Sequence, residues 1–296
     1  MCLSPLLFDI HRNRIVNRDR YSNIPESDYE SYGFLNVPCG HCLECRREHS
    51  RSWAVRLALE LEHSSSCYFI TLTYSDEFNP GFLDKGSLSR FLKRLRAYEH
   101  NHCADGIRFF ACGERGDRTG RPHYHLIIFN AFFDDLVLLS KNGPLFTSVA
   151  LDRLWGLGNV VVAEANFATM SYVSGYVLKK AYGRGSDEFI LMSRRPGLGI
   201  IGFDAFEALK TGKVYGRFGS RSYSSLSRFF VDFLQKSVSE SDFLTFKNER
   251  KLFALNFSSA RRSMYELGDL EYHLYRGRLN VDDCIREPDN VQFSHE

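Results

Sequence analysis

The stretch Arg121-Pro122-His123-Tyr124-His125-Leu126-Ile127-Ile128-Phe129 decides the fold of this chain. Its second half is apolar and β-branched and lacks glycine, which predicts a strand over 123–129. Because side chains alternate between the two faces of a strand, His123 and His125 share one face and Tyr124 lies on the other. Two imidazoles on one face can hold one divalent ion.

A third ligand is predicted on the preceding strand, which we expect over residues 107–112 and which is followed by Glu114. Residues 116–120 have the composition of a turn. A hairpin would therefore return Glu114 to the side of His123 and His125. Three protein ligands leave open positions for water and phosphate oxygens, so we expect a catalytic Mg²⁺ or Mn²⁺ site. The alternative is a strand end that carries two histidines by chance.

A tyrosine pair lies on a helix predicted over residues 167–182, with Asn166 as its N-cap. At ~100° per residue, Tyr172, Tyr176 and Lys179 share one face of this helix. The apolar side chains cluster on the opposite side. We therefore expect both tyrosines to reach one phosphate and Lys179 to stabilise its negative charge. Together with the histidines, this arrangement is what metal-assisted DNA nicking by a tyrosine nucleophile requires.

The order of predicted elements indicates an α+β fold. Helices are expected over 46–63 and 87–100, strands over 68–74 and 159–163, and the two strands above form a hairpin between them. This order predicts an antiparallel sheet with helices on one face. Residues 1–50 are expected to form an N-terminal arm, 51–200 the catalytic domain, and 201–296 a partly helical C-terminal extension to which no role is assigned.

Three cysteines at a spacing of three residues, Cys39, Cys42 and Cys45, form a second candidate metal site. A structural Zn²⁺ would need a fourth ligand, and His41 is a candidate. An Fe–S cluster is an alternative because such spacings also begin ferredoxin-type motifs. Three reduced thiols in a tight loop are the remaining possibility.

Composition and charge fit a protein without a membrane segment. The chain has 296 residues, of which 44% are hydrophobic and 25% are charged, and no apolar run reaches the ~18 residues of a membrane span. The N-terminus does not resemble a signal peptide, so a cytosolic location is expected. Residues 240–296 carry a net charge of −3 and the first 239 residues +5. An anionic partner is therefore expected on the N-terminal part.

Several side chains are candidates for DNA contacts. We expect cations near the tyrosines and histidines to line a DNA groove, and exposed aromatic rings to stack on unpaired bases. The predicted DNA-binding residues are Arg121, Lys180, Arg194, Arg195, Tyr74 and, as a second stacking ring, Tyr124.

The chain resembles the HUH-type rolling-circle replication initiators, in particular those of the microviruses and their gokushovirus branch. The resemblance covers residues 37–200 and rests on five segments, at 38–46, 69–74, 113–125, 172–180 and 193–199. It implies an RRM-like (palm-like) core, Mg²⁺ or Mn²⁺, and a 5′-phosphotyrosine intermediate on Tyr172 or Tyr176. It also implies Cys2 as the preferred fourth ligand of the cysteine cluster, since related phages tend to carry an early cysteine.

The resemblance implies partners as well. Single-stranded DNA and the origin of the replicative form are the expected substrates, in the cytoplasm of a bacterial host. The sequence contains no P-loop motif, so a separate host helicase and a polymerase are expected. Two other functions remain open: a zinc-containing nucleic-acid-binding module without catalysis, and a metallohydrolase that uses activated water.

Overall fold

The computed structural model describes residues 4–29, 31–99, 106–116, 119–140, 144–182 and 187–250. The chain divides into two compact units, Met1–His49 with Lys251–Glu296, and Ser50–Arg250. The division falls within helix α1 (Leu43–Glu62). In the described part of the chain, no helix is long and apolar enough to cross a membrane.

The first unit contains a small antiparallel sheet where the sequence analysis expected an irregular arm. Strands β1 (Leu6–Asp9), β2 (Arg14–Val16) and β3 (Phe34–Val37) pair in the order β2-β1-β3. Two 3₁₀ helices, η1 (Arg18–Tyr21) and η2 (Glu26–Asp28), connect β2 to β3. The core of this sheet is small and consists of Leu7, Tyr29 and Phe34. So few buried side chains give little alternation, which is why the strands were missed.

The second unit is built on a seven-stranded, fully antiparallel sheet with the order β10-β5-β6-β4-β9-β8-β7. Its strands are β4 (Cys67–Tyr74), β5 (Arg108–Arg115), β6 (Pro122–Phe129), β7 (Val137–Ser140), β8 (Leu145–Thr147), β9 (Gly158–Glu164) and β10 (Phe189–Met192). The predicted α+β class with an antiparallel sheet is confirmed. The strand β6 at its centre is the stretch from which the sequence analysis started.

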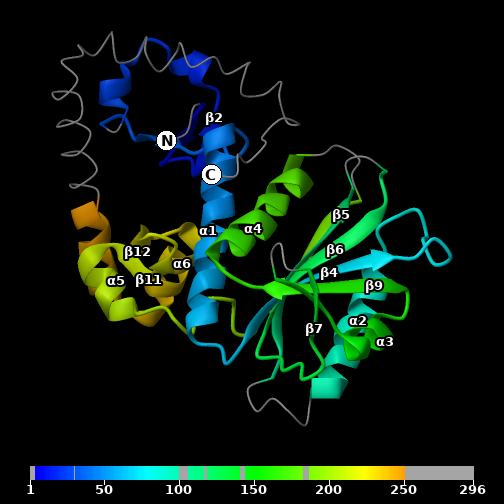
Figure 1. Ribbon diagram of the computed structural model, residues 1–296. Coiled ribbons are helices and arrows are strands. Elements are labelled where there is room, and N and C mark those ends of the chain that lie inside the picture. Colours follow the sequence, from blue (N-terminus) through cyan, green and yellow to red (C-terminus); the bar gives the residue numbers. More distant parts are fainter. Residues whose placement is uncertain are drawn as a thin grey trace. The chain divides into compact units, whose positions relative to one another are not determined.

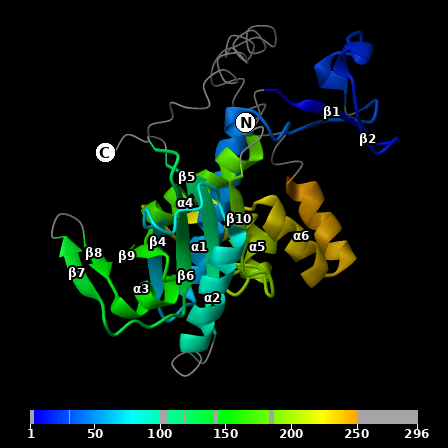
Figure 2. The same ribbon diagram turned by 90° about the vertical axis from the view of Figure 1, so that its right-hand side faces the viewer.

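Helices cover both faces of this sheet, so the expectation of helices on one face was wrong (Figures 1 and 2). Helices α2 (Lys85–Glu99) and α3 (Val149–Trp155) bury Phe91, Leu95 and Trp155 against one face. On the other face lie α1 and α4 (Phe167–Tyr182). The run Leu126–Phe129 already indicates two buried faces, because four consecutive apolar residues cannot all point to one side of a strand.

The face covered by α1 and α4 continues into residues 203–246, so the boundary expected at residue 200 does not separate two cores. These residues form α5 (Ala205–Thr211), the hairpin β11 (Lys213–Phe218) and β12 (Arg221–Ser225), α6 (Arg228–Ser237), and a helical segment at 240–250. Phe203, Phe218 and Phe230 belong to the same hydrophobic cluster as the sheet residue Phe129.

A buried charge network ties the loop after β10 to α1. The guanidinium of Arg108 donates to Glu60 and to the carbonyl of Pro196 (2.9 Å), and the other carboxylate oxygen of Glu60 accepts from the Gly199 amide at 2.7 Å. Gly199 has φ +81°, and a Cβ there would lie 2.6 Å from the backbone oxygen of Arg56. Only glycine fits this close approach. The network therefore fixes residues 196–199 against the helix.

Candidate metal and nucleotidyl-transfer site

Strand pairing brings the three predicted ligands together. In the β5–β6 register, Glu114 lies opposite His123, and Cys112 lies opposite His125. Directly paired residues of antiparallel strands point to the same face. Glu114, His123 and His125 therefore share the face that α1 and α4 cover, at the end of the sheet where β5 finishes and β6 begins.

The ligand atoms of these three residues lie within 4.8 Å of one another. Oε1 of Glu114 lies 2.6 Å from Nε2 of His123 and 3.2 Å from Nε2 of His125. Glu114 and His125 are buried, and His123 is half-buried. Two imidazole nitrogens and one carboxylate oxygen at this spacing can hold a divalent metal ion and leave coordination positions open.

The second nitrogen of each imidazole ring is also held. Nδ1 of His123 lies 3.1 Å from the carbonyl oxygen of Arg121, and Nδ1 of His125 lies 3.1 Å from the hydroxyl of Thr71. A carbonyl oxygen only accepts, so Nδ1 of His123 must carry the proton, and in the neutral ring Nε2 then presents its lone pair. Such contacts orient metal-binding histidines in known sites. Thr71 was missed from the sequence, although its pairing with His125 places it on the same face.

The carboxyl group of Glu114 is ionised at neutral pH. Burial raises its pKa, but hydrogen bonds from His123 and then His125 outweigh burial and lower the pKa to about 2. Both histidines interact with the ionised form, which is the form that binds a metal. The site is therefore prepared to receive a cation.

Tyr172 lies at the edge of this cluster. Its ring centroid is 5.8 Å from that of His125, at an interplanar angle of 77°, and 6.3 Å from that of Phe69. Phe69 stacks on the other side of His125, with centroids 5.6 Å apart. The Tyr172 side chain is 47% exposed, whereas Met170 and Val173 of the same helix are fully buried. This separation of faces was predicted for Tyr172, and the structure adds Phe69 as a ring that contacts both His125 and Tyr172.

The remaining residues predicted near Tyr172 fall outside the described part of the chain. The backbone of α4 is described through Tyr182, but the side chains of Tyr176, Lys179 and Lys180 are not. Their roles stay predictions. Gly175 of the same helix has open space where a Cβ would stand.

The loop between β4 and α2 carries exposed aromatic rings beside the site. Phe78 and Phe82 are 47% and 53% exposed. Two arginines hold this loop: Arg121 donates to the carbonyl of Tyr74 at 2.8 Å and pairs with Asp76, and Arg115 donates to the carbonyl of Gly81 at 3.1 Å. Both arginines flank the metal ligands in sequence, so the loop lies at the same end of the sheet.

Arg115 also forms a two-pronged ion pair with Asp187, at 2.9 and 2.8 Å. The hydrogen bond from Arg115 is the largest cause of a lowered pKa for Asp187, about 2. Asp187 accepts a further hydrogen bond from the backbone amide of Leu83 at 2.9 Å. One ion pair thus connects the end of β5, the loop before α2 and the segment before β10.

The predicted stacking of Tyr74 and Tyr124 on bases is wrong. Tyr74 is 3% exposed and Tyr124 is fully buried, and both pack against Trp155. Their hydroxyl groups lie 2.8 Å apart, and that of Tyr124 also donates to the carbonyl of Asp84 at 3.0 Å. Alternation accounts for the burial, because both residues lie on the opposite strand face from the histidines. The sequence signal for Phe78 and Phe82, two aromatics in a Pro/Gly-containing loop, was not used.

Arg194 and Arg195 are exposed but lie at the far end of the sheet. Strand β10 pairs Phe189 with Gly113 and Met192 with Phe110, so the turn that follows β10 lies beside Arg108. Six residues of strand separate Arg108 from Glu114, or about 20 Å. The structure therefore does not bring this arginine pair together with the metal ligands.

The cysteine cluster of the first unit forms a second group of metal-binding atoms. The sulfurs of Cys39, Cys42 and Cys45 lie within 4.8 Å of one another. Those of Cys39 and Cys45 are 4.0 Å apart, close to the ~3.8 Å between two thiolates on one tetrahedral zinc. The backbone amides of His41 and Cys42 donate to Cys39 at 3.4 and 3.3 Å. Among the described residues the group contains these three cysteines and not His41, and Cys2 lies outside the described part.

Comparison with known proteins agrees with this picture. Residues 67–181 match a family model described as replication-associated protein ORF2, and this segment contains all three candidate metal ligands and Tyr172. No solved structure gives a significant match to the chain.

Three relatives carry related names. The replication-associated protein ORF2 of Spiroplasma virus 4 is 32% identical over 195 residues, which cover 60% of this chain and 61% of the relative. The replication-associated protein ORF4 of Chlamydia phage 1 is 33% identical over 224 residues, 69% of this chain and 55% of the relative. The replication-associated protein VP4 of Bdellovibrio phage phiMH2K is 26% identical over 257 residues, 82% and 81% of the two chains.

The chain thus spans about three fifths of the length of the first two curated relatives. The kinship with phage replication proteins that the motifs predicted is confirmed. The chain belongs to the family of phage replication-associated proteins that this model describes.

Proposed function

We propose that this protein is a site-specific single-strand DNA endonuclease and ligase that starts and ends rolling-circle replication of a small circular phage genome. The observation that carries the proposal is the contact of the Tyr172 ring with the ring of His125, 5.8 Å between centroids. A phenol stands beside a metal-binding cluster and is exposed to solvent. Among the three functions that the sequence left open, only the nickase uses both features.

In this proposal Glu114, His123 and His125 hold Mg²⁺ or Mn²⁺. The bound ion would polarise the scissile phosphate and so reduce the demand on a phenol, which is a weak nucleophile at neutral pH. Thr71 and the carbonyl of Arg121 keep the imidazole Nε2 atoms turned towards Glu114. Phe69 and Tyr172 pack around His125 and restrict the ring further.

The reaction is a transesterification at phosphorus. The Tyr172 oxygen forms a bond to phosphorus, the bond from phosphorus to the 3′ oxygen breaks, and the phenolic proton is transferred to the released 3′ hydroxyl. The product is a 5′-phosphotyrosine, and attack by a 3′ hydroxyl reverses the step and closes a strand. The ester bond is exchanged rather than hydrolysed, so no ATP is needed. Tyr176 would serve the second cut, and Lys179 would stabilise the negative charge on the phosphate.

DNA contacts are assigned to the end of the sheet that carries the ligands. Phe78 and Phe82 take the role first given to Tyr74, because exposed rings can stack on unpaired bases. Arg121 and Lys180 would contact phosphates near the site. Arg194 and Arg195 would contact DNA only about 20 Å from the ligands, along the same strand direction.

The cysteine cluster is proposed to hold a structural Zn²⁺. The sulfur separations and the amide hydrogen bonds to Cys39 support this proposal. Cys2 remains the preferred fourth ligand, and an Fe–S cluster is the less favoured alternative. The partners in this proposal are single-stranded DNA, the replicative-form origin, and a helicase and polymerase of the bacterial host, in whose cytoplasm the protein would act.

A denaturing gel tests the proposal. A library of single-stranded oligonucleotides is labelled at the 3′ end in one set and at the 5′ end in another, and incubated with the protein and Mn²⁺. We expect the 3′ label to become linked to protein and the 5′ label to appear on a shorter strand. Replacing both Tyr172 and Tyr176 with Phe should abolish the adduct, whereas Tyr98→Phe, an exposed tyrosine on α2, should not.

Other outcomes separate the competing functions. Retention of DNA only on a native gel indicates the binding module, and release of two free ends without an adduct indicates the metallohydrolase. His125→Ala should lose cleavage and keep DNA binding, because phosphate contacts provide most of the affinity and the ion provides the rate. An undiminished adduct in the double tyrosine variant would overturn the mechanism.

A further inference from the structure

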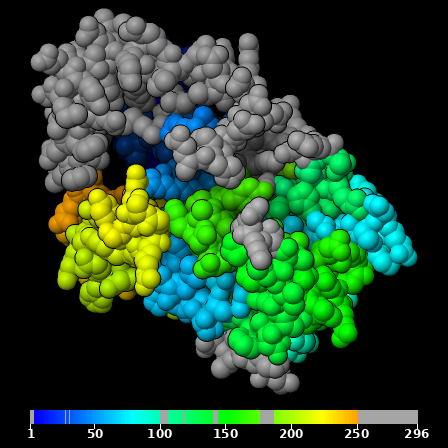
Figure 3. All heavy atoms as spheres, viewed as in Figure 1, coloured from blue at the N-terminus to red at the C-terminus, as the bar shows by residue number. Residues whose placement is uncertain are grey.

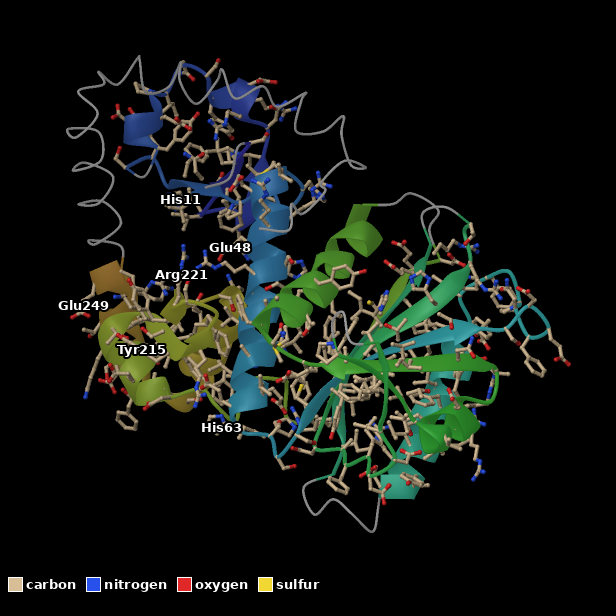
Figure 4. All side chains as sticks on the ribbon, in the orientation of Figure 1. His11, Glu48, His63, Tyr215, Arg221 and Glu249 are labelled. Carbon is tan, nitrogen blue, oxygen red and sulfur yellow. The ribbon has the colours of Figure 1, made fainter. Side chains whose placement is uncertain are left out.

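The hairpin of β11 and β12 presents an aromatic and basic surface that the proposed reaction does not use. Tyr215 and Tyr223 are direct cross-strand partners, with ring centroids 6.2 Å apart. They are 44% and 48% exposed. Val214 and Phe218 point to the other side and are buried in the core. The hairpin is thus fixed by its inner face, and its outer face offers two neighbouring rings to solvent (Figure 4).

Positive charge surrounds these rings. The ammonium of Lys213 lies 4.2 Å from the centroid of Tyr223. Residues 211–228 contain four cations, Lys213, Arg217, Arg221 and Arg228, and no acidic residue. Within the part of the chain that the structure describes, Arg228 pairs with Asp232, and no ion pair to a carboxylate is made by Arg217 or Arg221. These two guanidinium groups are therefore available to an anionic partner.

Acidic groups border the surface at one end only. Asp204 and Glu207 line a shallow hollow together with Lys213 and Tyr215. The carboxylate of Asp204 accepts from the Glu207 amide at 3.0 Å and caps α5. The two arginines lie towards the other end, next to the turn Gly219–Ser220. A polyanion is thus attracted to the side of the hairpin that carries Arg217 and Arg221.

The hairpin adjoins the helix that carries the nucleophile. The ring of Phe218 lies 6.2 Å from that of Phe167, the first residue of α4. Tyr172 follows five residues later, a rise of about 7.5 Å along the helix. In Figure 3 the yellow surface of the hairpin meets the green surface of α4 on the viewed face. A strand that leaves the metal ligands can therefore reach the hairpin without crossing the molecule.

We propose that the β11–β12 hairpin is a second binding surface for single-stranded DNA, separate from the nicking site. Exposed rings stack on unpaired bases, which a duplex does not offer, and the cations contact the phosphates between them. The surface would hold the strand that flanks the cut. This inference goes beyond the proposed chemistry, because the hairpin contains no group that takes part in bond breaking.

The test compares DNA affinities of full-length variants. Fluorescence anisotropy measures the Kd of an oligo(dT) of about 20 nucleotides and of one of about 6, lengths on either side of a typical single-strand site. Replacing Tyr215 and Tyr223 with Ser should raise the Kd of the long strand by about fivefold or more for each ring. The short strand, which can be bound at the nicking site alone, should lose less. Arg217→Gln with Arg221→Gln should reduce the slope of log K against log salt by about 0.7 for each lost phosphate contact.

Controls separate stacking from folding. The Tyr215→Phe/Tyr223→Phe variant keeps both rings and should bind like the wild type, and Phe206→Ser removes a 77% exposed ring from α5 that lies outside the surface. Circular dichroism verifies that each variant is folded. An unchanged Kd for the long strand in the folded serine variant overturns the proposal, as does an equal loss in the Phe206→Ser control. Nicking of a short substrate by the serine variant is the separate readout: its absence in the wild type would count against the proposed function and not against the hairpin.

Discussion

Thr71→Val tests whether the hydroxyl contact to His125 tunes the metal site. The substitution keeps the shape of the side chain and removes the group that lies 3.1 Å from Nδ1 of His125. His125 is 6% exposed, so its N–H would lose its partner in a place that water reaches poorly. An unsatisfied buried donor costs about 1–3 kcal/mol. Loss of such a support typically lowers metal affinity about 10- to 100-fold, which is about 1.4–2.8 kcal/mol. The two figures agree.

The assay is the Mn²⁺ concentration that gives half-maximal cleavage of single-stranded DNA. It should rise about 10- to 100-fold in Thr71→Val, and the rate at saturating Mn²⁺ should change much less, because the ligands themselves remain. Thr73→Val is the matched control: it lies on the same face two residues along β4, and its hydroxyl donates to the carbonyl of Asn159 at 3.3 Å. Equal Mn²⁺ requirements for the two folded variants would refute the reasoning.

Three further predictions concern the second metal group, the ion pair and the aromatic loop. Cys42→Ser should lower the melting temperature and release one equivalent of metal, because a structural ion contributes folding energy; metal analysis of the wild type that finds neither zinc nor iron would contradict this. Asp187→Asn should destabilise the fold by about 1 kcal/mol at pH 7, a value reduced because the carboxylate is partly exposed. The folded pKa of Asp187, about 2, lies below its usual 3.8, so this contribution is present above pH ~4 and is lost as the pH falls towards 2, and urea titrations of both proteins at several pH values should converge there. Phe78→Ser should weaken binding of single-stranded DNA about fivefold or more without changing the melting temperature, and unchanged affinity in a mobility-shift titration would rule out stacking by that ring.

The parts of the fold that the sequence predicted are those with long periodic signals. Strand β6 and helix α2 begin and end within two residues of their predicted limits. Glu114 was placed beside His123 from turn chemistry alone, and the β5–β6 register confirms that pairing. Local rules were sufficient there because a short hairpin leaves few alternative registers.

The missed elements depend on contacts between distant segments. Strand β10 has four residues and is defined by its pairing with β5, more than seventy residues earlier, which no local pattern encodes. The hairpin β11–β12 contains Gly, Ser and Arg in strand positions, and its register is set by the burial of Val214 and Phe218 in a core made by other segments. The error on Tyr74 has a different origin. Its strand face was readable from alternation, but the ring was assigned by residue type.

The apolar cover of the ligand-bearing face has an evolutionary consequence. The segment 67–181 that defines the family contains the sheet strands β4–β6 and α4, yet Val55 and Leu59 of α1 and the phenylalanines of 203–246 complete the same core. A descendant that keeps only the shared segment would expose these strands to water and would aggregate. Any lineage that changes its termini must therefore acquire a replacement lid in the same step, so divergence at the ends should proceed by exchange of whole packing units rather than by gradual loss.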